Sequence, residues 1–333
     1  MAYQDFERDI IGTFMYDVKN GYTESTIEDL KNPKAERKYK EYLDKVASIN
    51  PRELSCNYTD TISNDTFGIM ADHLFQDIFS EKLNSEYTDL VERHLCVNHS
   101  DKLMEGVSLK IIDPKDSSKV FNVMEVPDFS HVSSIVCLMH EYVHYHFQAA
   151  NIDTRRKKYY DEILPIFVEK VTAKMLKDQF DINDIEQIVH ESRLETINWH
   201  YFVHPKEVKF LLDNLPKLKR NAEKGDFTAK FSLDKLYETY PCLQTAEGTQ
   251  YFEMYNKHLA AAYGIGYLFS EFLFEKYRED EALGKKLFNS VLLNEMSLEE
   301  LLKYYNIYSA NRSVYEVAEG RLKLVKENRG LIK

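Results

Sequence analysis

The hydrophobic positions along the chain predict a mainly helical protein with one short interruption by strands. Between residues 65 and 95, apolar side chains recur every three or four positions, which is the spacing of one helix face. These positions are Phe67, Met70, Leu74, Ile78 and Phe79. We expect two earlier helices, over residues 1–20 and 26–49, which Asn-Gly and Asn-Pro pairs end.

The period of the pattern changes after residue 106. Residues 107–112 and 119–126 are typical of two β-strands around a polar turn, and Pro127 ends the second strand. Beyond Pro127 the pattern is helical nearly to the last residue. Residues 215–226 begin with Leu-Pro and are mostly polar, so we expect a linker or surface loop there. The expected fold class is mostly α (α+β), with a small antiparallel sheet ahead of a long helical part.

Composition supports a helical chain and narrows the possible partners. Gly (11) and Pro (8) are scarce, whereas Tyr (23) and Phe (19) are plentiful. The formal net charge of −12 argues against a general nucleic-acid binder, and the basic run at residues 155–158 is typical of a solvated helix face. No stretch approaches 18 apolar residues, so we expect no membrane span.

The cysteines predict a reducing compartment. None belongs to a CxxC pair, so we expect free thiols. The four are Cys56, Cys96, Cys137 and Cys242. The first residues lack a basic segment followed by an apolar one, which argues against an ordinary signal peptide. We expect a cytoplasmic protein; export by a dedicated secretion machine would leave no trace here.

The strongest chemical signal is an HExxH motif within an apolar, helix-like stretch. His140 and His144 lie one turn apart on the same helix face, so both imidazoles can bind one Zn²⁺. Glu141 can then activate a water molecule. The alternative is a helix that carries these three side chains by chance, but a buried His-Glu-His face without a partner would be costly. His146 lies at a different helical angle, so we do not expect it to be a ligand.

A catalytic zinc site has three protein ligands and one open position, so a third ligand is needed. Two candidates stand downstream: Glu162, 18 residues after His144, and Glu169, 25 residues after it. They are seven residues apart and would share a helix face. The residues alone leave both open.

Residues 161–169, with the sequence DEILPIFVE, resemble the NEGxAxYxE segment of aminopeptidase-N-like gluzincins. The resemblance implies that Glu162 binds zinc and that Glu169 accepts a hydrogen bond from a ligand His. The chain differs by having Ile163 in place of the Gly and Pro165 in place of the Ala. If Pro165 begins the helix, Glu162 lies just outside it, and Glu169 becomes the better candidate for the third ligand.

A second resemblance favours Glu169. Its spacing, with Thr172 three residues later, is similar to the thimet oligopeptidase and oligoendopeptidase pattern, although Val143 replaces the Gly before the second His. We favour Glu162 as the ligand and keep Glu169 as the alternative.

Residues 263–277 resemble the YxxG helix of the aminopeptidase-like group. This implies that Tyr263 stabilises the oxyanion, with His258 as an alternative donor; the other reading is that Tyr263 is a core aromatic residue. Gly264 and Gly266 would allow this helix to approach its neighbour closely. The family also has an edge strand before the HExxH helix that binds an extended peptide, which would be residues 120–126 here.

The sequence thus predicts a thermolysin-like zinc metallopeptidase core in residues 106–333, preceded by an N-terminal helical region in residues 1–105 that matches no family. The expected partner is a peptide or protein substrate. The rival functions are a zinc hydrolase of a non-peptide amide or ester and a catalytically inactive, metal-containing binding protein. A second group of titratable residues around His190, His200 and His204 is expected to consist of core or surface histidines.

Overall fold

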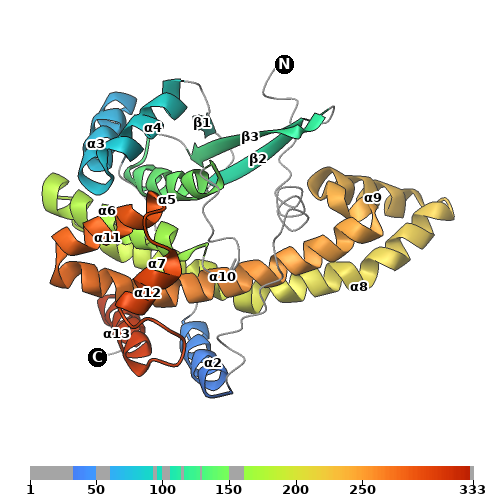
Figure 1. The fold of residues 1–333 in the computed structure, drawn as a ribbon. Helices are drawn as coiled ribbons and strands as arrows, with labels where there is room; N and C mark the ends of the chain where they lie inside the picture. Colours follow the sequence, from blue (N-terminus) through green and yellow to red (C-terminus); the bar gives the residue numbers. More distant parts are fainter. Residues whose placement is uncertain are drawn as a thin grey trace.

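The computed structural model describes residues 33–49, 61–92, 96–99, 106–113, 116–127, 130–149 and 161–330. The helix expected over residues 1–20 and the basic run at 155–158 lie outside these ranges. Figure 1 shows a mostly helical molecule with one small sheet, as the hydrophobic pattern predicts. None of the helices in the described ranges is long and apolar enough to cross a membrane.

The sheet is the expected hairpin with one further strand. β2 (Val107–Asp113) pairs antiparallel with β3 (Asp116–Pro127), and β1 (Cys96–His99) pairs parallel with the end of β3. The strand order β1-β3-β2 makes β3 the central strand. The expectation that residues 120–126 form an edge strand is therefore wrong for residues 124–126, because β1, which the hydrophobic pattern did not indicate, pairs with β3 from Met124 onward.

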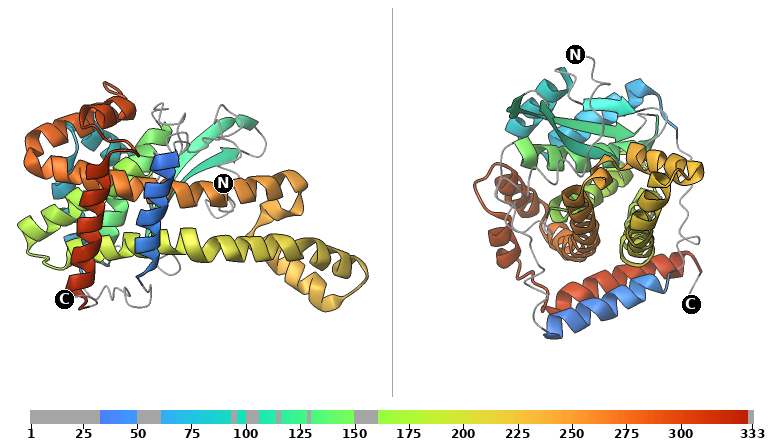
Figure 2. Two further views of the ribbon diagram at one scale, coloured as in Figure 1. Left: turned by 90° about the horizontal axis from the view of Figure 1, so that it is seen from below. Right: turned by 90° about the vertical axis from the view of Figure 1, so that its right-hand side faces the viewer.

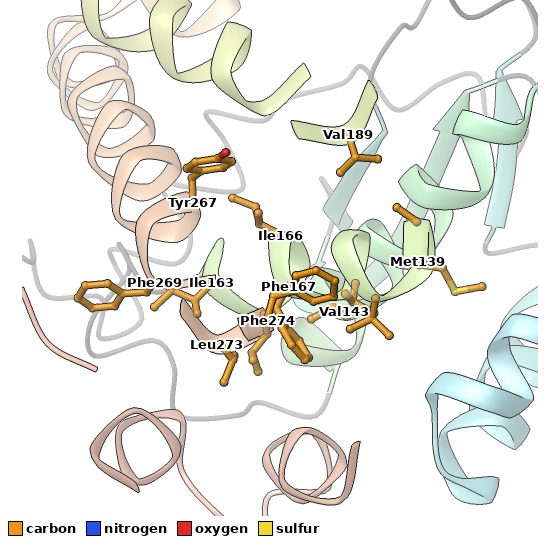
Figure 3. Close-up of a cluster of buried hydrophobic side chains, with 14 of the residues drawn as sticks. Met139, Val143, Ile163, Ile166, Phe167, Val189, Tyr267, Phe269, Leu273 and Phe274 are labelled. Atoms are coloured by element: carbon orange, nitrogen blue, oxygen red, sulfur yellow. The ribbon is translucent and has the colours of Figure 1, made fainter. Parts of the chain in front are cut away.

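Three helices under the sheet form the centre of the molecule. They are α5 (Val132–Ala149), α6 (Ile163–Phe180) and α10 (Ala246–Glu279). Every residue of α6 from Ile163 to Ala173 is buried, since neighbouring helices surround it. Figure 3 shows side chains of all three helices meeting in one apolar cluster, which includes Met139, Val143, Ile163, Ile166, Phe167, Tyr267, Leu273 and Phe274. Each buried side chain of this size contributes roughly 1.5–3 kcal/mol.

The remaining helices surround this centre or, in the case of α8 and α9, extend away from it (Figure 1). They are α2 (Pro33–Ala47), α3 (Asn64–Ile78), α4 (Glu81–Glu92), α7 (Ile185–Asn198), α8 (His204–Glu223), α9 (Phe227–Thr239), α11 (Glu281–Leu292), α12 (Leu298–Tyr304) and α13 (Arg312–Asn328). The helical spacing predicted over residues 65–95 corresponds to two helices, α3 and α4. The chain turns at Ser80, whose N–H donates to Asn289 Oδ1 at 2.7 Å instead of continuing the helix.

The loop expected at residues 215–226 is also wrong in its first part. α8 continues through Pro216 to Glu223 and, with α9 and the first half of α10, forms an arm that projects from the centre (Figures 1 and 2). Pro216 lacks the N–H for one helical bond. Leu215 beside it is buried in a second apolar cluster with Val208, Leu243 and Phe252, and this packing holds the helix together.

Candidate metal centre

Helix α5 brings the two motif histidines together. The Nε2 atoms of His140 and His144 lie 3.1 Å apart, as expected for side chains one helical turn apart. His140 is buried and His144 is half-buried, so His144 is the more accessible of the two to solvent.

Glu162 completes a group of three side chains that could hold a metal ion. Its two carboxylate oxygens lie 3.5 Å from His140 Nε2 and 3.4 Å from His144 Nε2. A tetrahedral ion with bonds of about 2.0–2.2 Å holds neighbouring donors about 3.4 Å apart. Oε2 of Glu162 is buried and has no hydrogen-bond partner, which is costly unless a cation lies there. These three residues can therefore hold a metal ion.

The start of α6 places Glu162. The helix begins at Ile163, so Glu162 is the residue just before it, and Pro165 lies in the first turn, where its missing N–H costs nothing. Glu162 thus lies just outside the helix, which is the position expected if the helix began near Pro165. Its carboxylate nevertheless lies close to both histidines. Gly266 of α10 packs directly against Glu162, as the close approach expected from the glycines of this helix requires.

Glu169 lies on the other side of the His140 ring. Its Oε1 is 2.7 Å from His140 Nδ1, which favours a proton on Nδ1 and leaves the lone pair on Nε2 for a metal. Arg193 of α7 donates two hydrogen bonds to the same carboxylate, from Nε at 2.7 Å and from Nη2. Burial alone would raise the pKa of Glu169, but Arg193 and His140 lower it to about 2.

With no ion between them, His144 and Glu162 each shift the pKa of the other. Burial would lower the pKa of His144, but the Glu162 carboxylate raises it to about 9. Burial would likewise raise the pKa of Glu162, but His144 and His140 lower it to about 2. The site therefore presents a carboxylate to a positive charge, which either a proton or a metal ion can supply.

Glu141 lies beside the three ligands without joining them. Its Oε1 is 3.9 Å from His140 Nε2. Burial raises its pKa, against the opposing effect of the two histidines. A carboxylate with a raised pKa is a stronger base, which suits a group that accepts a proton from water.

Tyr263 contacts two residues, His200 and Arg193, that the sequence did not connect with the site. Its ring stacks on His200 with centroids 4.9 Å apart, and the Arg193 guanidinium lies 6.0 Å from its centroid. Arg193 in turn holds Glu169, so a chain of contacts joins Tyr263 to His140. His258, the alternative donor, is half-buried in the same helix.

Sequence reasoning missed Arg193 and the position of His200. Arg193 lies 24 residues from Glu169, and no local pattern joins them. His200 belongs to a five-residue π-helix (Trp199–Val203) between α7 and α8. Such irregular turns are frequent at functional sites, but the hydrophobic pattern does not reveal them. Burial and the nearby His204 lower the pKa of His200 to about 4, so it is neutral at physiological pH.

Three further histidines of the described ranges have partners other than the three side chains of the site. His146 contacts Glu86 Oε2 at 2.7 Å and the Leu292 carbonyl at 2.6 Å. His204 Nε2 lies 2.5 Å from Asn256 Oδ1, and His190 Nδ1 lies 2.9 Å from Glu271. Within the described ranges, no other group of three such side chains has the geometry of a metal site.

Comparison with known proteins shows a likeness in fold alone. No family model and no curated protein matches the chain. The chain is similar in structure to PZ peptidase A, solved with an inhibitor, at a TM-score of 0.52 and 12% identity over 89% of this chain. A putative oligoendopeptidase F from Bacillus anthracis matches with a TM-score of 0.48 and 11% identity over 99% of this chain. The chain spans 58% and 57% of the length of these two structures.

Proposed function

We propose that this protein is a zinc-dependent hydrolase of peptide bonds. The observation that carries the proposal is the set of three donor side chains whose atoms lie 3.1–3.5 Å apart, with Glu141 beside them. Two imidazoles and one carboxylate are the ligand set of many catalytic zinc sites. The fold likeness to PZ peptidase A supports a peptide as the substrate.

Each side chain has a distinct task in this proposal. His140, His144 and Glu162 hold the ion, and Glu169 with Arg193 fixes the orientation of the His140 ring. When bound, zinc polarises the substrate carbonyl and lowers the pKa of water. Glu141 accepts a proton from the attacking water and delivers it to the leaving amine. Tyr263 donates a hydrogen bond to the oxyanion, with His258 as the alternative donor.

The test is a comparison of the wild type with Glu141→Gln on a mixed library of fluorogenic peptides. The substitution keeps the shape of the side chain and removes the base, so hydrolysis should fall by about 10²–10⁴ or more. Bound zinc and thermal stability should stay unchanged. Activity within tenfold of wild type would rule out Glu141 as the base. A wild type that carries zinc and cleaves esters or non-peptide amides but no peptide would overturn the substrate assignment.

A further inference from the structure

We propose that two glycines, Gly106 and Gly266, are positioning residues that set the two key carboxylates of the site. Gly106 leaves the space that Glu141 occupies, and Gly266 leaves the space that Glu162 occupies. The roles of Glu141 as the base and of Glu162 as a metal ligand are taken from the proposed function, on which this inference rests. It adds that two backbone segments far apart in the chain determine where these groups lie.

Gly106 lies directly against the proposed base. A Cβ at this position would lie 2.5 Å from Glu141 Cγ and 2.6 Å from Cys137 Sγ. The N–H of Gly106 also donates to Cys137 Sγ at 3.2 Å, which holds the glycine against α5. The φ angle of Gly106 is not in the left-handed region, so an alanine is opposed by lack of space alone.

A second contact attaches the same segment to Glu141. Ser108, two residues after Gly106 and within β2, donates its hydroxyl hydrogen to the backbone carbonyl of Glu141 at 2.8 Å. Gly106, just before β2, thus lies against the side chain of Glu141, and Ser108 contacts its backbone. A change in the position of this strand must move the base relative to the ligands on the same helix.

Gly266 has the same relation to the third ligand. A Cβ there would lie 2.6 Å from Glu162 Cβ and 3.1 Å from both the Glu162 carbonyl carbon and Ile166 Cδ1. Two of these atoms belong to the backbone or to the first side-chain carbon, which cannot swing away as the tip of a side chain can. An alanine would therefore move Glu162 and the first turn of α6.

The two contacts predict separable effects. A shift of Glu141 should lower the rate of the chemical step, because misplacement of a reacting group by about 1 Å costs on the order of 10²-fold. It should leave the ion in place. A shift of Glu162 should weaken the hold on the ion itself. A merely structural role of either glycine would instead lower both properties together with stability.

The first arm of the experiment uses Gly106→Ala, with Gly320→Ala as its control because a Cβ there meets nothing within 4 Å. We expect Gly106→Ala to bind zinc within threefold of wild type, measured by competition with a chromophoric chelator, and to keep its KM. We expect kcat to fall at least about tenfold. In a crystal structure, the Glu141 carboxylate should be displaced. Cys137→Ala makes room beside the added methyl, so the double variant should recover part of kcat.

The second arm compares Gly266→Ala with Gly264→Ala. Gly264 lies in the same helix and is as crowded, but its neighbours are Tyr39 and Tyr201. We expect Gly266→Ala to weaken zinc binding by about 10–100-fold, as lost support of a ligand usually does. Gly264→Ala should keep the affinity of wild type. If Gly266→Ala unfolds, adding Ile166→Val removes the nearest flexible obstacle and restores a measurable protein.

Two results would overturn the proposal. One is an equal loss of zinc affinity in Gly264→Ala and Gly266→Ala, because crowding of the helix would then explain both. The other is a Gly106→Ala protein with an undisplaced Glu141, or with zinc affinity reduced as much as kcat. The affinity and crystallographic readouts do not require peptide hydrolysis. If the wild type cleaves no peptide, the proposed function fails while these two arms still decide the role of the glycines.

Discussion

At the scale of single residues, the two acidic side chains contact opposite edges of the His140 ring. Glu162 lies 3.5 Å from Nε2 and Glu169 lies 2.7 Å from Nδ1. A histidine that binds a metal through one nitrogen usually donates a hydrogen bond from the other. The geometry therefore supports Glu162 as the ligand and Glu169 as the residue that orients His140.

A paired substitution tests this assignment. Glu162→Ala removes one of three direct ligands, so zinc affinity should collapse to the level of a two-histidine site. Glu169→Ala leaves the three donors in place, so affinity should fall only about 10–100-fold. Titration of the metal-free proteins with zinc measures both. The reverse order would move the ligand role to Glu169 and favour the oligoendopeptidase resemblance.

The sequence predicts that the side chains of His140 and His144 lie together, as they do, but it predicts the rest of the candidate site less well, for a physical reason. The distance between His140 and His144 depends only on helix geometry, which is local. The position of Glu162 depends on where α6 begins and on how closely α10 approaches at Gly266, which are tertiary contacts. The contact between Arg193 and Glu169 joins two helices, so no residue spacing indicates it.

At the scale of elements, α7 supports the site through Arg193, which is largely buried. Its two hydrogen bonds to Glu169 join α7 to α6 beside the proposed metal ligands. A guanidinium presents two parallel donors to a carboxylate, which a lysine cannot do. This link therefore depends on the shape of the Arg193 side chain as well as on its charge.

Arg193→Lys should consequently weaken zinc binding by about tenfold, a loss in the range of other supporting contacts. Arg193→Met should weaken it further, because Glu169 then loses its buried counter-charge. The matched control is Lys174→Met, which removes ion pairs at the surface of α6. Zinc affinity of the three proteins by chelator competition is the measurement. Equal affinity in Arg193→Met and wild type would show that α7 does not support the site.

The element boundaries show the limits of a one-dimensional pattern. The hydrophobic pattern predicts the β2–β3 hairpin because alternation is local, but it does not show that β1 flanks β3. The pattern predicts that a helix ends at Pro216, whereas α8 continues past that position because Leu215 packs in an apolar cluster. In each case a contact with a distant segment decides the outcome.

At the scale of the whole molecule, a buried group of charges joins four helices behind the site. Glu271 of α10 contacts Lys170 Nζ of α6 at 2.7 Å and His190 Nδ1 of α7 at 2.9 Å. Nε of Arg321 in α13 lies 3.7 Å from the second carboxylate oxygen of Glu271. Burial would raise the pKa of Glu271, but Lys170 and His190 hold it well below its ordinary value. The fold thus depends on Glu271 being ionised.

This dependence predicts loss of stability in acid. An unfolded glutamate has a pKa of about 4.3, so the contribution of Glu271 is fully present above that pH and is lost as the pH falls toward its lower folded pKa. Glu271→Gln should be less stable at neutral pH by about 3–5 kcal/mol, because Lys170 remains buried without a counter-charge. Between pH 6 and pH 3, a range of about three units that spans the pKa of an unfolded glutamate, the stability of Glu271→Gln should change less than that of wild type. Urea unfolding at each pH measures the free energy of unfolding of both proteins. If this free energy falls in parallel in the two proteins as the pH is lowered, Glu271 is not the group responsible.

Metal analysis of the purified protein is the decisive test of the proposal that His140, His144 and Glu162 hold one metal ion. Elemental analysis of wild type beside His144→Ala, purified without added chelator, should find one zinc per chain in the wild type and almost none in the variant. Circular dichroism should show both proteins folded. Stoichiometric zinc in His144→Ala, or a folded wild type that binds no zinc when the ion is supplied, would show that these three side chains do not form a zinc site.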